Sequence, residues 1–166
     1  MPSDDPRSPA RVYEALAPSV LGYFRAQRMR DPEGLTGDVF VAVTEGLGRF
    51  RGDDAALRRW VFTIAHHRRV DEIRRANRRP EVLDGALTGP PVLDEPPTDP
   101  DLIAALQALT TDQREVVVLR FVADLSTSEV ARIVGKRVGA VKMLQSRGLA
   151  ALADHPALSG ESSDDA

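Results

Sequence analysis

Cysteine is absent from this 166-residue chain, and aromatic residues make up only 5% of it. Without thiols, a disulfide framework, thiolate metal sites and cysteine chemistry are excluded. No uncharged apolar run approaches the roughly 20 residues that a bilayer-crossing helix needs, and the N-terminus lacks the apolar core of a signal peptide. The length allows one compact domain or two domains of about 70 residues each. We therefore expect a soluble cytoplasmic protein with no membrane insertion.

Charge is segregated along the chain, although the formal net charge is only −3. Residues 49–79 hold 10 basic and 4 acidic side chains, and residues 110–150 hold 7 and 4, whereas residues 80–109 hold 6 acidic side chains and no basic one. Arginine provides 20 of the 22 basic residues, and its guanidinium suits bidentate contacts with phosphate and guanine. The two basic blocks are candidates for nucleic-acid binding, and ordinary solvated helix faces are the alternative.

Proline divides the chain into parts, because 6 of the 12 prolines fall between Pro80 and Pro100. This acidic stretch can neither continue a helix nor bury much apolar surface, so it predicts a flexible linker over 80–100. Two domains are then expected, over 1–79 and 101–153. The acidic, serine-rich tail over 154–166 is expected to be disordered.

Apolar residues recur at spacings of three and four in the first half, which is typical of amphipathic helices. The pattern predicts one helix around residues 12–24, a second over about 32–47 that begins at the Asp31-Pro32 cap, and a third over about 54–77. The third helix should bury one stripe in its first half and project arginines outward in its second half. The predicted stripe consists of Leu57, Trp60, Val61 and Ile64.

Helix boundaries are marked more sharply in the second half. The pairs Thr110 with Gln113 and Ser126 with Glu129 have the spacing of capping boxes, so helices are predicted at about 111–122 and 127–134. A short helix over 101–109 should precede them, and a final helix should run from near 137 to 152.

The last two helices have the register of a helix-turn-helix. Ala131 is small where the helices must approach, Gly135 occupies the turn, and Val130 and Val134 supply a packing face. The second helix is expected to bury Val141, Leu144, Leu149 and Leu152. A helix of this kind fits the major groove of DNA, although glycine-linked helix pairs also occur in structural bundles. Its predicted DNA-facing residues are Arg137, Gly139, Ala140, Lys142, Met143, Ser146 and Arg147.

Two stretches on either side of the predicted linker carry a family resemblance. The stretch LTGDVFVAVTEGLGRFRGDDAALRRWVFTIAHHRRVDEIRRANRR resembles region two of the extracytoplasmic-function (ECF) sigma factors, and LQALTTDQREVVVLRFVADLSTSEVARIVGKRVGAVKMLQSRGLAAL resembles their region four. The resemblance implies an all-α fold, with a region two helical bundle and a region four helix-turn-helix joined by the linker. It implies core RNA polymerase and promoter DNA as partners, and it leaves room for an anti-sigma factor, which no residue identifies.

The resemblance also implies roles for particular residues. The polymerase-binding set is Leu35, Asp38, Val39, Val41 and Ala42. Region two would engage the −10 promoter element, with a flipped base held near the loop over 50–54, while region four would read the −35 element as duplex. The implied −10 set is Phe50, Arg51, Asp53, Arg58, Arg59, His66, His67, Arg68, Arg69, Arg74 and Arg75.

The chain departs from the family pattern at several of these positions. Gly37 stands before Asp38 where the family usually has glutamine. Ala140, Met143 and Ser146 replace residues common in the recognition helices of relatives, so base preference does not transfer from a relative. The pair at 66 and 67 often includes asparagine in the family, whereas here both residues are histidine.

No enzyme active site, metal site or cofactor is predicted. Adjacent His66 and His67 lie about 100 degrees apart on a helix, which does not give the paired ligand spacing of a zinc site. Trp60 is interpreted as a core residue rather than a base-stacking platform, while both roles stay open for Phe50. Two alternative functions remain: a stand-alone helix-turn-helix regulator with an N-terminal helical dimerisation or sensing domain, and a helical interaction protein with no DNA role.

Overall fold

The computed structural model describes residues 5–78 and 99–159. These residues form two compact units, one within Met1–Glu95 and one within Pro96–Ala166. Every regular element in the described part of the chain is helical, which confirms the all-α prediction. None of these helices combines the length and apolar character that crossing a bilayer requires. Apart from its last two residues, the predicted linker over 80–100 lies outside the described residues.

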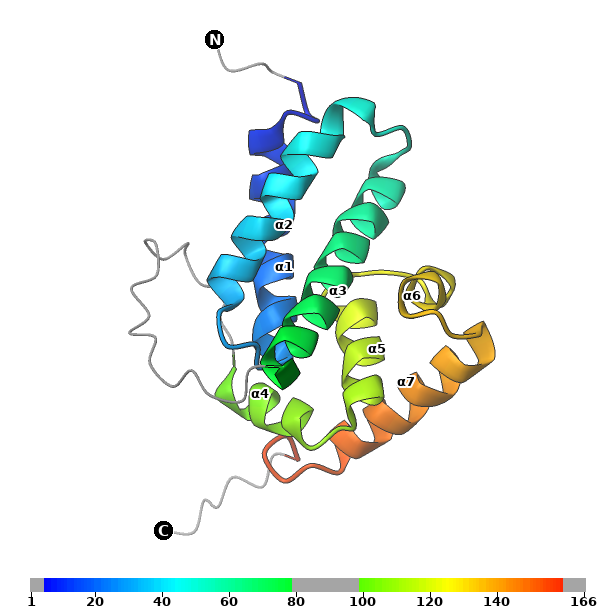
Figure 1. Cartoon of the computed structure of the whole chain (residues 1–166). Coiled ribbons are helices and arrows are strands. Elements are labelled where there is room, and N and C mark those ends of the chain that lie inside the picture. Colours follow the sequence, from blue (N-terminus) through cyan, green and yellow to red (C-terminus); the bar gives the residue numbers. More distant parts are fainter. Residues whose placement is uncertain (1–4, 79–98, 160–166) are drawn as a thin grey trace, which may run out of the picture. The chain divides into compact units, whose positions relative to one another are not determined.

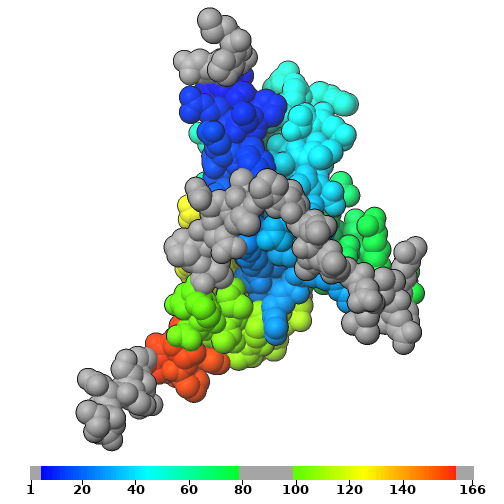
Figure 2. All heavy atoms as spheres, turned by 90° about the vertical axis from the view of Figure 1, so that its left-hand side faces the viewer, coloured from blue at the N-terminus to red at the C-terminus, as the bar shows by residue number. Residues whose placement is uncertain are grey.

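The first unit is a bundle of three long helices (Figure 1). They are α1 (Pro9–Ala26), α2 (Pro32–Gly46) and α3 (Asp54–Arg78), with a short 3-10 helix, η1 (Leu47–Arg49), after α2. Successive helices run in opposite directions, and α2 packs against both α1 and α3. In Figure 2 the first turns of α1 lie beside the later part of α2. The rings of Tyr13 of α1 and Phe40 of α2 meet edge to face, with their centroids 5.0 Å apart.

An aromatic cluster fills the centre of this bundle. Tyr23 and Phe24 of α1 and Phe62 of α3 are fully buried, and the ring of Tyr23 packs edge-on against both phenylalanines. The buried stripe of α3 is Leu57, Val61, Phe62, Ala65 and Arg69. Trp60 and Ile64, which the sequence placed on this stripe, are only half-buried. The helix is therefore turned so that residues four apart, starting from Leu57, face the core.

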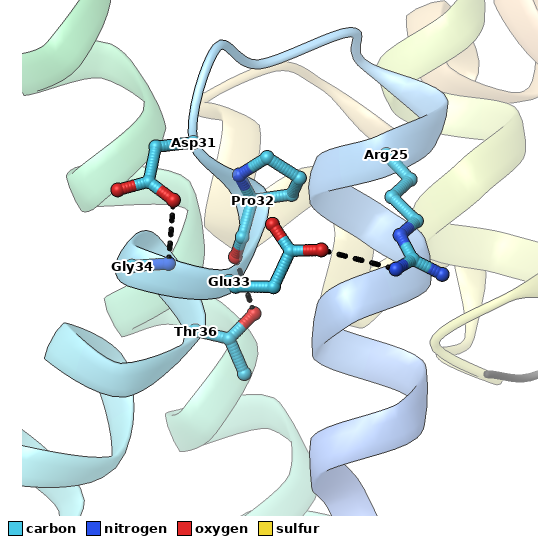
Figure 3. Close-up of polar contacts among 6 residues, drawn as sticks. All are labelled: Arg25, Asp31, Pro32, Glu33, Gly34 and Thr36. Carbon is cyan, nitrogen blue, oxygen red and sulfur yellow. Dashed lines mark hydrogen bonds and ion pairs between the residues drawn. The ribbon is translucent and has the colours of Figure 1, made fainter. Parts of the chain in front are cut away.

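Polar contacts fix the junction between α1 and α2 (Figure 3). The Asp31 carboxylate accepts a hydrogen bond from the Gly34 amide at 2.9 Å, which confirms the predicted cap. Arg25 Nη2 lies 3.1 Å from Glu33 Oε1, and this ion pair joins the end of α1 to the first turn of α2. The junction thus fixes where α2 begins and joins its first turn to the end of α1.

The second unit consists of four helices, α4 (Pro100–Gln107), α5 (Thr111–Phe121), α6 (Thr127–Val134) and α7 (Val138–Ala153). Both predicted capping boxes are present, and each joins a helix to the residue before it through two hydrogen bonds of 2.8–3.2 Å. Gly135 ends α6 in the left-handed conformation, with φ at 69°, as expected for the turn of a helix-turn-helix.

The chain continues past the expected start of the acidic tail in hydrogen-bonded turns. The carbonyl of His155 accepts from the Leu158 amide at 3.0 Å and from Ser159 Oγ at 2.7 Å. These turns extend the described structure five residues beyond Asp154. Residues 160–166 lie outside the described part of the chain.

Candidate nucleic-acid and polymerase interfaces

The outward face of α7 brings the predicted −35 residues together. All seven are exposed, six on the helix and Arg137 at its N-cap position. No acidic side chain occurs between residues 137 and 153, so Lys142 and Arg147 act on this face without a neutralising carboxylate in the helix. An exposed cationic helix at the second position of a helix-turn-helix has the geometry that enters a DNA major groove.

The buried face of α7 differs from the prediction at one position. Val141 is fully buried, and Leu144 and Leu152 are half-buried, but Leu149 is 38% exposed, so its predicted burial is wrong. Gly148 is buried in its place. A Cβ added at Gly148 would lie 2.8 Å from Val117 Cγ2, which shows that α7 approaches α5 closely only because this residue has no side chain.

A single arginine joins three segments of the second unit, and no motif in the sequence predicted this role. Arg120, near the end of α5, donates from Nε to Gln145 Oε1 of α7 at 3.1 Å. Its Nη1 donates at 2.5 Å to the carbonyl of Leu125, just before α6. Both Arg120 and Gln145 are half-buried. The sequence feature that could have indicated this role is the single basic residue in the otherwise apolar run VVVLRF.

The loop before α3 is held by its own residues. Asp53 caps α3, with its carboxylate accepting from the Ala56 amide at 2.8 Å, and Arg51 Nη1 donates to the Phe50 carbonyl at 2.9 Å. Phe50 stacks on Trp60 of α3, and both rings are half-buried. Trp60 therefore lies at the edge of the bundle rather than in its centre. Asp53 is exposed, and its carboxylate also stabilises the start of α3.

The remaining −10 residues vary in how far they reach the surface. His67, Arg74 and Arg75 are exposed, as are Arg51 and Asp53. Those that are half-buried are Phe50, Arg58, Arg59, His66 and Arg68. Arg69 is only 7% exposed, which corrects the expectation that it lies on the outward face. It follows Leu57, Val61 and Ala65 at four-residue spacing, so its aliphatic stem extends the stripe that α3 buries.

The polymerase-binding set on α2 separates into two faces. Asp38 is exposed, Val41 is 60% exposed and Ala42 is half-buried. Leu35 and Val39, in contrast, are 7% and 0% exposed, so they belong to the core of the bundle and not to a surface for a partner. Their spacing of four residues places them on the side of α2 that packs on its neighbours.

No group of three histidine, aspartate or glutamate side chains that could hold a metal ion occurs within residues 5–78 and 99–159. The rings of His66 and His67 have centroids 6.1 Å apart and are tilted by 52° relative to each other.

Comparison with known proteins agrees with this geometry. Residues 12–79 match the family described as Sigma-70 region 2, and residues 100–152 match the family described as Sigma-70, region 4. The chain is 30% identical over 153 residues to the ECF RNA polymerase sigma factor BldN of Streptomyces coelicolor, covering 86% of this chain and 58% of BldN. It is 31% identical over 159 residues to ShbA of Streptomyces griseus, an ECF sigma factor, covering 81% of this chain and 80% of ShbA.

A solved structure shares the fold. The sigma factor RpoE, crystallised in complex with the anti-sigma factor NepR from Bartonella quintana, matches with a TM-score of 0.71 and 21% identity, covering 92% of this chain and 97% of RpoE. The fold and both matched regions define a sigma factor of the sigma-70 class. The chain belongs to the ECF RNA polymerase sigma factors, the subunits through which the polymerase initiates transcription at specific promoters. A stand-alone regulator is not favoured by these findings.

Proposed function

We propose that this chain binds core RNA polymerase and directs it to one set of promoters, reading and melting the −10 element through residues 1–79 and reading the −35 element through residues 101–153. The linker over 80–100 and the tail beyond 153 carry no recognition role in this proposal. The observation that carries it is the cationic, acid-free face of α7 on a helix-turn-helix, in a chain whose other unit carries a second arginine-rich helix.

Recognition of the −35 element needs no strand opening. An α-helix fits the major groove, and residues in its first turns reach base edges. Gly139, Ala140 and Met143 are exposed on these turns of α7 and supply shape and apolar contacts, while Lys142 and Arg147 supply charge. Met143 is 53% exposed, and a thymine methyl group is a suitable apolar partner for it.

Melting of the −10 element requires a base to leave the duplex stack, which costs a few kcal/mol. Stacking on an aromatic ring and contacts with the phosphate backbone recover part of this free energy. Phe50 lies in the loop before α3, and its ring stacks on Trp60. The exposed and half-buried arginines of this unit, namely Arg51, Arg58, Arg59, Arg68, Arg74 and Arg75, supply the positive charge. Arg69 is excluded from this set because it is buried.

Contact with the polymerase is assigned to the outward face of α2, with Asp38 and Val41 at its centre and Ala42 at its edge. Leu35 and Val39 support this face from inside the bundle. The likeness to RpoE bound to an anti-sigma factor supports an anti-sigma protein as a further partner of this chain. We place the chain in the cytoplasm together with the polymerase and assign it no catalytic reaction of its own.

Transcription with purified components tests the proposal. Core RNA polymerase should produce run-off transcripts from the chain's own promoters only when the chain is added, and transcript starts should share upstream elements. A stand-alone regulator would bind duplex DNA unaided and would add nothing to core polymerase alone. If the chain never associates with core polymerase under conditions in which ShbA does, the proposed function is wrong.

A further inference from the structure

The recognition helix α7 contacts the rest of its unit at two positions three residues apart. Gly148 sets how closely α7 approaches α5, because any side chain at this residue would collide with Val117. Three residues earlier, Gln145 accepts the hydrogen bond from Arg120 Nε at 3.1 Å. Residues three apart lie on the same side of a helix. A short steric contact and a directional polar contact therefore act on the same side of α7.

These two contacts constrain different motions. The close approach at Gly148 limits the distance between α5 and α7. Because Gly148 has no side chain that interlocks with α5, this contact does not prevent rotation of α7 about its axis. A hydrogen bond weakens steeply when its angle departs from linearity, so the contact between Arg120 and Gln145 opposes that rotation. Gln145 is next to Ser146 and two residues from Met143, so a rotation of α7 that breaks this bond also displaces these two exposed residues.

The same guanidinium also holds the entrance to α6. Its Nη1 donates to the Leu125 carbonyl, and Leu125 directly precedes Ser126, whose side chain caps α6. One side chain on α5 thus connects to α7 and to the segment that leads into α6. Since a guanidinium presents its donors in a rigid plane, the two acceptors are held in a fixed relation to each other.

We propose that Arg120 is a positioning residue for DNA sequence discrimination: through Gln145 it sets the rotation of α7, and through Leu125 it sets the start of α6, so that the exposed residues of α7 meet base edges in one register. This inference rests on the proposed function, because it concerns how the −35 element is read. Arg120 itself contacts no base in this proposal.

Arg114 provides a matched control on the same helix. It donates from Nε to the Leu106 carbonyl at 2.9 Å and from Nη2 to the Leu109 carbonyl at 3.2 Å. Like Arg120, it is a half-buried arginine of α5, but these two carbonyls lie in α4 and in the turn before α5. Replacement of either arginine removes hydrogen bonds that α5 makes to neighbouring segments, but of the two only Arg120 donates to Gln145.

The experiment uses the full chain bound to core polymerase. The wild-type complex first selects −35 elements from a random duplex library. The affinity ratio between the selected element and versions with single altered base pairs is then measured for four variants, Arg120→Met, Gln145→Met, Gln145→Glu and Arg114→Met. Methionine has a similar length and helix propensity but removes the oxygen acceptor, whereas glutamate keeps an acceptor for Arg120.

Gln145→Met should reduce the affinity ratio about tenfold, the discrimination that a well-placed base contact provides, while binding to DNA without a −35 element changes less than about twofold. Gln145→Glu should retain the affinity ratio. The added negative charge repels both DNA sequences equally, so it lowers both affinities by the same factor and leaves their ratio unchanged. Arg114→Met should retain it as well. Arg120→Met should reduce the ratio to a similar extent as Gln145→Met. An unchanged ratio in Arg120→Met or in Gln145→Met, or an equal reduction in Arg114→Met, would overturn the positioning role and leave the proposed function intact. Failure of the wild-type complex to select any −35 element would overturn both.

Discussion

The rings of Phe50 and Trp60 stack with their centroids 5.2 Å apart and their planes inclined by only 21°. This pair joins the loop before α3 to the first half of that helix. Trp60 is also close to the end of α2, since a Cβ added at Gly46 would lie 2.7 Å from its Cζ2 atom. Because Trp60 is the only tryptophan in the chain, its fluorescence reports on this end of the first unit.

Replacement of Gly46 by alanine should displace the indole of Trp60 and disturb its stacking on Phe50. We expect a changed emission spectrum and weaker binding of single-stranded −10 DNA by the complex with core polymerase. Gly37→Ala is the control on the same helix, where an added Cβ meets no atom within 4 Å. Alanine favours a helix over glycine by up to about 1 kcal/mol, so the control should be stabilised with an unchanged spectrum. Identical spectra for the two variants would contradict the role given to Gly46.

Removal of the two cationic side chains from α7 should weaken −35 recognition. Lys142→Ala and Arg147→Ala are expected to cost roughly 1–3 kcal/mol for each specific base interaction that the substitution removes, as measured by binding of the polymerase complex to duplex promoters. Arg132→Ala is the control, because it removes the same charge from an exposed position on α6 outside the predicted face. The control should affect selected and unrelated sequences equally. Unchanged transcription from duplex promoters in both α7 variants would exclude this face of α7 from −35 recognition.

Reversal of charge at Asp38 should impair assembly with the polymerase. Asp38 is exposed on α2 next to Val41, so Asp38→Arg should leave the bundle folded but reduce co-purification with core polymerase. Glu14→Arg makes the same charge change at an exposed position on α1. Circular dichroism of both variants should match the wild type. If Asp38→Arg co-purifies as well as Glu14→Arg does, Asp38 lies outside the interface.

The turn of the helix-turn-helix should be sensitive to its backbone conformation alone. A Cβ at Gly135 meets no atom within 4 Å, but the residue has a positive φ of 69°. Gly135→Ala should therefore lower the free energy of unfolding by about 1–2 kcal/mol without any steric clash. Gly139→Ala, where an added Cβ is also in open space within α7, should not lower it. Urea unfolding followed by circular dichroism compares the two, and equal midpoints would refute the account.

The helix boundaries could be predicted closely because short-range chemistry determines them. Asp31 before Pro32, and the pairs Ser126 with Glu129 and Thr110 with Gln113, satisfy backbone donors within a few residues. Such contacts depend on sequence neighbours and not on the remainder of the fold. The order of helices and the glycine turn followed from the same signals.

The exact face that each helix buries could not be predicted as well. Successive residues of a helix face directions that differ by 100 degrees, so Gly148 and Leu149 face different neighbours. Hydrophobic periodicity predicted that Leu149 is buried. The close packing of α7 on α5 buries Gly148 instead, and a glycine has no side chain that contributes to a hydrophobic pattern. On α3, the family resemblance placed Arg69 among the DNA-contacting arginines, but its position continues a buried stripe. The contact between Arg120 and Gln145 links residues 25 apart, and no local pattern indicates it.

The final two turns of α3 contain no buried side chain, since residues 73–78 are all exposed. Short helical segments without tertiary packing are only marginally stable in water, so these turns depend mainly on their own backbone hydrogen bonds. Arg74, Arg75 and Arg78 also repel one another there, which lowers the cost of local unfolding. Nucleic-acid phosphates that bind these arginines would relieve the repulsion. Binding of nucleic acid and ordering of the last turns of α3 are therefore thermodynamically coupled.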